Sequence, residues 1–236
     1  MSSTIYKLEK RELIRPPNWL SDNIMYETVM GSQAYGCSND ESDIDIYGFC
    51  IPPKEQVFRL GEIPGFGKQI QRFEQYQQHG VEDKSNNKVY DFQIFSIVKY
   101  FQLAMENNPN MIDSLFTGQN CVLHLTQIGN LVRENRRLFL HKGSYFKLKG
   151  YSFSQKNKIC GHNRIGKRKD TLTEEGADKK FMYHTVRLLL QCEMILEEHD
   201  LDLTRHKEHL KAIRNGLFSF QDINDWFASK EKHLET

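Results

Sequence analysis

Apolar and polar residues recur with two different periods along this chain. Residues 43–51 alternate at first and then run apolar, as a strand does, and residues 88–94 predict a second strand. Residues 94–105 carry one apolar stripe at helical spacing, which includes Val98 and Met105. The remaining segments of this half are residues 23–30, which fit a short helix or a strand, residues 54–87, which suggest a long insertion, and residues 110–116, which fit a short helix.

After about residue 120 only helical periods remain. Gly216 fits a helix stop, and Ser219 with Asp222 resembles a capping box at the start of the last helix. In the clearest helix, polar residues form a narrow stripe opposite a wide apolar face, and that stripe is Lys180, His184, Arg187 and Gln191. The predicted helices cover residues 122–133, 145–159, 176–199, 205–215 and 219–233.

This pattern predicts an α+β fold of two domains. Residues 1–118 would form a domain with a small mixed sheet and helices, and residues 119–236 a helical C-terminal domain. A hydrophobic content of 39% is ordinary for a globular protein and provides a sizeable core without disulfides. A net charge of +1 excludes a global field for polyanions, so nucleic-acid binding would depend on a local patch.

The cysteines and the termini exclude further classes of protein. No C-x-x-C pair occurs among the five cysteines, so neither a zinc knuckle nor a redox motif is supported. The first residues lack an apolar signal segment, and no long apolar run follows, so we expect a cytoplasmic protein with no membrane span. The cysteines are Cys37, Cys50, Cys121, Cys160 and Cys192.

Two carboxylates stand two residues apart at the start of the first predicted strand. Asp43 and Asp45 would point to one face of that strand, while Ile44 and Ile46 point to the other. Two adjacent carboxylates repel each other unless a cation lies between them, and oxygen ligands suit hard divalent ions such as Mg²⁺. Such ions hold a triphosphate and an attacking hydroxyl for in-line displacement.

The short motif before these carboxylates fits the phosphate groups of the same reaction. Gly31 lets the backbone approach a phosphate closely. Ser32, at an expected helix start, would offer a hydroxyl and unpaired backbone N–H groups to an anion. A lone D-x-D or Gly-Ser pair is common, and the order and short spacing of the two together are much more specific.

The combined motif resembles a known family. G-S-x-A-Y-G at residues 31–36, followed by S-D-I-D-x-x-G at residues 42–48, is similar to nucleotidyltransferases of the DNA polymerase β superfamily. More narrowly, it resembles the predicted nucleotidyltransferase family that includes the RNA-ligase-associated RlaP proteins. Further similar segments are Asp91 to Phe101, Asn108-Pro109-Asn110 with Leu115-Phe116, Lys149-Gly150-Tyr151 with Gln155, Lys180 with His184 and Arg187-Leu188-Leu189, and Ile213-Arg214-Asn215-Gly216.

The resemblance implies a polymerase-β-like fold, a reaction and a set of site residues. The reaction is transfer of a nucleoside monophosphate from a nucleoside triphosphate, such as ATP, to a hydroxyl, with release of pyrophosphate. Asp91 would be the third carboxylate beside Asp43 and Asp45, and the three would bind Mg²⁺ or Mn²⁺. The expected nucleotide-binding residues are Gly31, Ser32, Lys180, His184 and Arg187.

One dense basic run suggests a nucleic-acid partner, an RNA or tRNA end. Tyr145, Phe146, Tyr151 and Phe153 precede this run and would either stack on bases or belong to the core. A solvated loop is the alternative for the run itself. Its cationic residues are Lys156, Lys158, Arg164, Lys167, Arg168 and Lys169.

Three other functions stay open at this point. The chain fits a non-catalytic nucleotide-sensing module on the same fold, although such a module does not need three carboxylates. It also fits an RNA-binding adaptor that uses residues 145–169. A nucleotidyltransferase that modifies proteins is the third alternative, and the RNA-repair setting of the family enters by analogy.

Overall fold

The computed structural model describes residues 2–37, 43–57, 72–160, 172–173 and 176–235. The chain packs as two compact units. Unit 1 comprises Met1–Ala34, Ser38–Met105 and Asp113–Arg136, and unit 2 comprises Tyr35–Cys37, Glu106–Ile112 and Arg137–Thr236.

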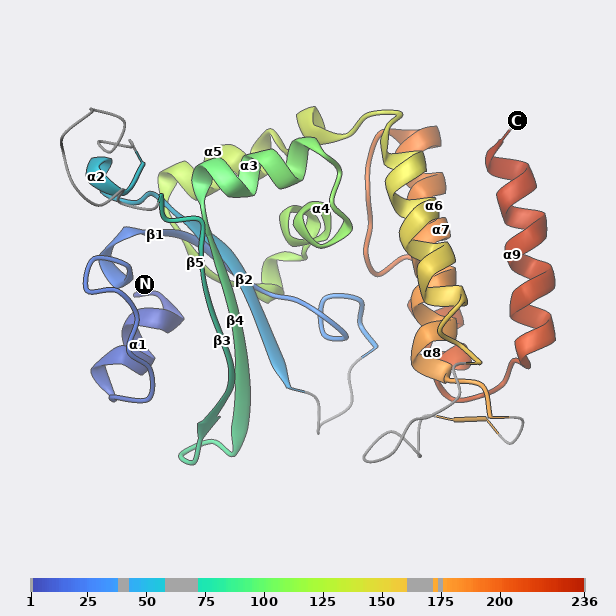
Figure 1. Cartoon of the computed structure of the whole chain (residues 1–236), viewed down its shortest axis with the longest axis horizontal. Helices are drawn as coiled ribbons and strands as arrows, with labels where there is room; N and C mark the ends of the chain where they lie inside the picture. The colour runs from blue at the N-terminus through green and yellow to red at the C-terminus, as the bar shows by residue number, and fades with distance from the viewer. Residues whose placement is uncertain (1, 38–42, 58–71, 161–171, 174–175, 236) are drawn as a thin grey trace, which may run out of the picture. The chain divides into compact units, whose positions relative to one another are not determined.

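Unit 1 is built on a mixed sheet of five strands in the order β3-β4-β2-β1-β5 (Figure 1). The central strands β2 and β4 run parallel, and the other neighbouring pairs run antiparallel. The strands are β1 (Ile24–Val29), β2 (Ile44–Cys50), β3 (Gln75–Asp83), β4 (Lys88–Ser96) and β5 (Val122–Leu125). The α+β class and the helical C-terminal region predicted from the sequence are thus confirmed.

Two parts of the predicted element pattern need correction. Residues 54–87 are not one irregular insertion, because α2 (Lys54–Val57) and strand β3 lie within them; residues 58–71 lie outside the described residues. The helix predicted at 122–133 is also wrong at its start. Its first four residues form β5, and α5 (Gln127–Glu134) begins only after Thr126, whose hydroxyl accepts a hydrogen bond from the Gly129 N–H.

One face of the sheet packs against α1 (Thr4–Lys10). Ile46, Phe92 and Ile94 are fully buried there, together with Ile5 of the helix. Glu27 on β1 is buried too, and its carboxylate accepts the N–H groups of Thr4 at 2.5 Å and Ile5 at 3.2 Å. Burial raises the pKa of the Glu27 carboxyl. The carboxylate therefore fixes the first turn of α1 on the sheet.

Within the described residues of unit 1, helices cover the opposite face where β2 and β4 end. There α3 (Ile97–Met105) and α4 (Pro109–Phe116) bring Tyr100 against Phe49, with ring centroids 4.9 Å apart. Tyr26 of β1 donates a hydrogen bond from its hydroxyl to the Ser114 carbonyl at 2.6 Å. The start of β2 on the same face carries polar residues of the site described below.

The apolar stripe predicted for residues 94–105 is only partly buried. Val98 is 39% exposed and Met105 60% exposed, whereas Tyr100 and Ala104 make the buried contacts of α3. The sequence pattern misses Tyr100 because its ring is amphipathic. Its hydroxyl is hydrogen-bonded to the Ser114 hydroxyl within the core.

In the described part of unit 2, α7 packs against α6, α8 and α9 (Figure 1). Because α7 lies among its neighbours, Arg187 and Gln191 are 5% and 2% exposed, whereas Lys180 at the start of the polar stripe is exposed. Ser219 and Asp222 form the predicted capping box of the last helix. These helices are α6 (Ser144–Lys156), α7 (Lys179–Glu198), α8 (Lys207–Arg214) and α9 (Phe220–Leu234).

Among the described residues, no helix combines the length and the apolar character that a membrane span requires.

Gly48 allows β1 and β2 to approach, and its replacement should destabilise unit 1. A Cβ at this position would lie 2.0 Å from the carbonyl oxygen of Tyr26 and 3.2 Å from the Cα of Glu27, both in the neighbouring strand. Because backbone atoms cannot turn away, we expect Gly48→Ala to lower the free energy of unfolding by about 1–3 kcal/mol. Chemical denaturation measures the change.

Gly150→Ala is the matched control, because a Cβ at Gly150 in helix α6 meets nothing within 4 Å. This variant should be more stable than the wild type by about 0.5–1 kcal/mol, since alanine favours the helix. Equal stabilities for the two variants would contradict the strand-approach argument.

Candidate active site

Asp45 and Asp91 lie directly opposite each other on the two parallel strands. The register pairs Ile44 with Tyr90, Asp45 with Asp91, and continues without a shift to the ends of both strands. Paired residues of adjacent strands share one face and stand roughly 4.8 Å apart. Both carboxylates are partly exposed, while Ile46 is buried on the other face. The predicted alternation of both strands is therefore confirmed.

Asp43 immediately precedes β2 and is exposed. It lies two residues before Asp45, at the N-terminal end of β2. Asp43 and Asp45 thus belong to the start of β2, and Asp91 occupies the facing position of β4.

Gly31 brings the backbone against this carboxylate pair. The N–H of Met30 donates to the Asp45 carbonyl at 2.7 Å, which ends the β1–β2 ladder beside the site. Gly31 follows with φ +66°, and a Cβ there would lie 2.4 Å from Oδ2 of Asp45. Only glycine satisfies both conditions.

Ser32 does not begin a helix. Residues 31–36 form a series of turns, so the expected anion site at a helix N-terminus is absent from this motif. The left-handed residues Gly31 and Gly36, at φ +66° and φ +65°, divert the chain before a helix can begin.

A bulge in β3 holds Asp91 in place. The register of β3 and β4 shifts between Gln78 and Val81, so that His79 and Gly80 together face the Asp91 position. The N–H of Gly80 donates to Oδ1 of Asp91 at 2.8 Å, and Nδ1 of His79 lies 3.2 Å from Oδ2. The sequence analysis missed His79; the glycine that follows it within a strand was the available signal.

The pKa of the Tyr47 hydroxyl is affected by the two carboxylates. Burial, together with Asp45 and Asp91, raises the pKa of the Tyr47 hydroxyl to about 12. The two facing carboxylates offer oxygen ligands of the kind that Mg²⁺ or Mn²⁺ prefers. A divalent cation bound there would compete with His79 for Asp91.

In unit 2, Tyr35 and Gln191 hold the buried guanidinium of Arg187. Nη1 of Arg187 donates to the Tyr35 hydroxyl at 2.8 Å and to Oε1 of Gln191 at 3.1 Å. The guanidinium carbon also lies 4.3 Å from the centroid of the Tyr35 ring. Tyr35 belongs to the 31–36 motif, and this role was not predicted.

Further cations surround His184 in the same unit. Burial lowers the pKa of His184 well below its ordinary value, and Arg187, Lys180 and Arg214 lower it further. Arg214 lies 5.6 Å from the centroid of the Tyr183 ring and donates to the Cys37 carbonyl. Arg214 was expected only as part of the family-like segment Ile213 to Gly216, with no role in the site. Lys180, Arg187 and Arg214 therefore concentrate positive charge around His184.

The basic run falls mostly outside the described residues. Lys156 lies over the Phe227 ring and Lys158 over the Phe181 ring, at 4.4 Å and 5.9 Å from the centroids. Arg164, Lys167, Arg168 and Lys169 lie outside the described residues.

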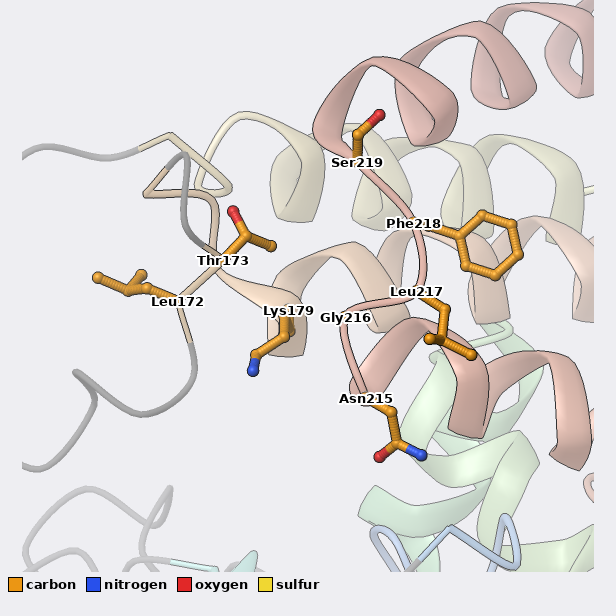
Figure 2. Close-up of a pocket in the computed structure, with 8 residues that line it drawn as sticks. All are labelled: Leu172, Thr173, Lys179, Asn215, Gly216, Leu217, Phe218 and Ser219. Atoms are coloured by element: carbon orange, nitrogen blue, oxygen red, sulfur yellow. The ribbon is translucent and has the colours of Figure 1, made fainter.

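Figure 2 shows a pocket of about 400 Å³ in unit 2. It lies between the loop that leads into α9 and the start of α7. None of the predicted site residues lines it; the lining residues are Leu172, Thr173, Lys179, Asn215, Gly216, Leu217, Phe218 and Ser219.

Comparison with known proteins adds the family. The sequence model of RlaP, described as an RNA repair pathway DNA polymerase beta family, matches residues 4–235. An uncharacterised 38.9 kDa protein from the nrdC–mobD intergenic region of Enterobacteria phage T4 is 24% identical over 115 residues, which cover 48% of this chain and 32% of that protein. The chain thus matches about a third of the length of this relative.

A solved structure is also similar. The nucleotidyltransferase-like protein from Exiguobacterium sibiricum 255-15 superposes with a TM-score of 0.34 and 9% identity. The superposition covers 97% of this chain and 72% of that protein.

The neutral state of His184 should make the stability of the protein depend on pH. Because its folded pKa is below the ordinary value of 6.5, the unfolded chain binds the proton more readily. This contribution to stability is complete above pH 6.5 and is lost as the pH falls below that value. Between about pH 7 and about pH 5, we expect a steeper loss of unfolding free energy in the wild type than in His184→Gln.

Denaturation of both proteins at each pH measures the difference. His206 and His209, whose pKa values burial also lowers, are present in both proteins and cancel in the comparison. Parallel pH profiles would show that His184 is protonated as easily in the folded protein as in the unfolded one.

Proposed function

Because the chain belongs to the RlaP family of polymerase-β-like proteins, we propose that it is a metal-dependent nucleotidyltransferase. It would move a nucleoside monophosphate from a nucleoside triphosphate to a hydroxyl and release pyrophosphate. The description of the family as an RNA-repair family favours an RNA or tRNA end as the acceptor.

The observation that carries the proposal is the pairing of Asp45 with Asp91 beside Gly31. The parallel register sets two carboxylates side by side, and the glycine turn brings backbone atoms against one of them. A purely structural sheet has no need of two facing carboxylates, because their repulsion destabilises it. A site for a divalent cation and a phosphate explains both features.

Asp43, Asp45 and Asp91 would hold the divalent cation, Mg²⁺ or Mn²⁺. Such a cation neutralises charge on the triphosphate and orients the reacting groups. Asp91 would accept the proton of the attacking hydroxyl, as a positioned carboxylate does in general base catalysis. The Gly80 N–H holds Oδ1 of Asp91, so the direction in which this carboxylate points is set by the sheet.

Lys180, His184 and Arg187 would bind phosphate groups, with Gly31 and Ser32 as the second phosphate-binding element. Lys180 is exposed and free to follow a flexible triphosphate. Arg187 is held by Tyr35 and Gln191, so its guanidinium loses little conformational freedom on binding an anion. Neutral His184 would donate one hydrogen bond without adding to the repulsion among the cations.

A nucleotide-sensing module is the second candidate, and one observation favours it. Both oxygens of Asp91 already have partners, Gly80 and His79. A protein that only binds a triphosphate would keep these contacts. The transfer assay below separates the two candidates, and it also tests a protein hydroxyl as acceptor, since label would then appear on protein.

Asp45→Asn should abolish transfer and leave the fold intact. The substitution keeps the size of the side chain but removes the charge that the cation requires. We expect label transfer from an α-³²P-labelled triphosphate, with Mg²⁺ or Mn²⁺ and total RNA, to fall by about a thousandfold or more. Scintillation counting of RNA and protein fractions measures the transfer.

Asp22→Asn is the matched control, because Asp22 is an exposed aspartate in unit 1, remote in sequence from the motif. It should transfer at the wild-type rate. Full activity of Asp45→Asn would refute the assignment, and triphosphate binding without any transfer by the wild type would favour the sensing module.

Lys180→Ala should weaken triphosphate binding, while the neighbouring Lys179→Ala should not. Lys180 adds to the positive field at His184, whereas Lys179 lines the separate pocket. Loss of one charge-assisted contact predicts an affinity about tenfold lower for Lys180→Ala. Equilibrium dialysis with a labelled triphosphate measures it, and equal affinities of the two variants would remove Lys180 from the site.

A further inference from the structure

Helix α6 turns three aromatic side chains toward solvent. Phe146 is 76% exposed, Phe153 is 52% exposed and Tyr151 is 44% exposed. Phenylalanine is usually a core residue, so two exposed rings on one helix mark a surface that meets a partner. The sequence analysis left open whether these aromatics stack on bases or belong to the core, and their exposure excludes the core.

The other sides of α6 are covered within unit 2. The hydroxyl of Ser152 donates to the Thr185 carbonyl of α7 at 2.7 Å. The ammonium of Lys149 lies 2.8 Å from the carboxylate of Glu231 and 2.8 Å from that of Glu235, both on α9. The exposed rings therefore belong to the side of α6 that these two helices leave uncovered.

Phe146 and Phe153 flank an open gap. They are seven residues apart, which places them on one side of the helix and roughly 10 Å apart along its axis. Gly150 stands between them, and a Cβ there would meet nothing within 4 Å. A flat group can thus lie against either ring without meeting a side chain at this position.

The segment of the chain that carries these rings has no acidic residue of its own, although Glu231 and Glu235 of α9 reach Lys149. No acidic residue occurs from Asn135 to Lys169, a stretch of 35 residues with seven lysines and four arginines. The rest of the chain then has 21 basic and 31 acidic residues, from totals of 32 and 31. The ammonium of Lys147 pairs with Glu106 at 3.5 Å, and such a half-exposed pair is weak.

We propose that this face of α6 docks single-stranded RNA, with bases stacked on Phe146 and Phe153. We call Phe146, Gly150 and Phe153 the stacking face. Aromatic rings stack on any base, and flanking lysines attract the phosphate backbone without reading sequence. An apolar protein partner would explain the rings but not seven lysines and four arginines in a segment that has no acidic residue of its own. The proposal rests on the proposed function in that the RNA would be the acceptor.

The test replaces both phenylalanines in the full chain. A 5′-fluorescein oligoribonucleotide of about 12 nucleotides without secondary structure is titrated with each protein, and anisotropy gives the Kd. The double variant Phe146→Ala/Phe153→Ala should bind about a hundredfold more weakly, from about tenfold per ring. Exposed rings support no core, so the variant should keep the wild-type unfolding curve.

A second pair of variants separates stacking from apolar contact. Phe146→Tyr/Phe153→Tyr keeps the rings and should keep the wild-type Kd. Phe146→Leu/Phe153→Leu keeps the apolar surface, removes the π-face and should bind as weakly as the alanine variant. Wild-type affinity of the alanine or leucine variant for the oligoribonucleotide would overturn the proposal. It would also be overturned if the wild type were a dimer and the alanine variant a monomer.

Asp45→Asn distinguishes this proposal from the proposed function. That variant should lose transfer and keep the RNA affinity. Loss of transfer in Asp45→Asn together with unchanged RNA affinity in the alanine variant would overturn only the stacking face. Retained transfer in Asp45→Asn, with weakened RNA binding in the alanine variant, would overturn only the transferase.

Discussion

The parallel pairing of β2 with β4 is the constraint on which the carboxylate site depends. Asp45 and Asp91 repel each other, so their pairing lowers the stability of the sheet. The opposite face decides the register, because Ile46 and Phe92 are fully buried there. A slip of one residue would bury a carboxylate and expose a core side chain. The hydrophobic core therefore supplies the free energy that keeps two like charges side by side.

Unit 2 also holds like charges close together, and there the charges are positive. Arg187 is buried near Lys180 and Arg214, and the ionised guanidinium needs compensation for its lost hydration. The hydroxyl of Tyr35, the amide oxygen of Gln191 and the face of the Tyr35 ring provide it with neutral groups. A carboxylate in their place would neutralise the guanidinium. The proton lost from His184 limits the repulsion among these cations.

The sequence predicted the elements with a clear period and failed where a contact decides the outcome. Strand β5 has only four residues, too few to separate a strand from the first turn of a helix. Periodicity left the environment of the polar stripe of α7 open, because it does not show that neighbouring helices also bury Arg187 and Gln191. Asp45 and Asp91 were predictable from alternation, whereas the contact of His79 with Asp91 depends on a bulge that alternation alone does not reveal.

A net charge of +1 hides the chemistry of this chain because it sums two opposite concentrations. Unit 1 sets carboxylates on one sheet face, and the 35 residues from Asn135 to Lys169 carry cations alone. Transfer from a triphosphate needs both signs, since the cation requires carboxylates and the phosphates require basic groups. An acceptor with a phosphate backbone adds a second demand for positive charge. A net charge near zero is therefore compatible with such a reaction. The distribution of charged residues along the chain shows the two concentrations that the total conceals.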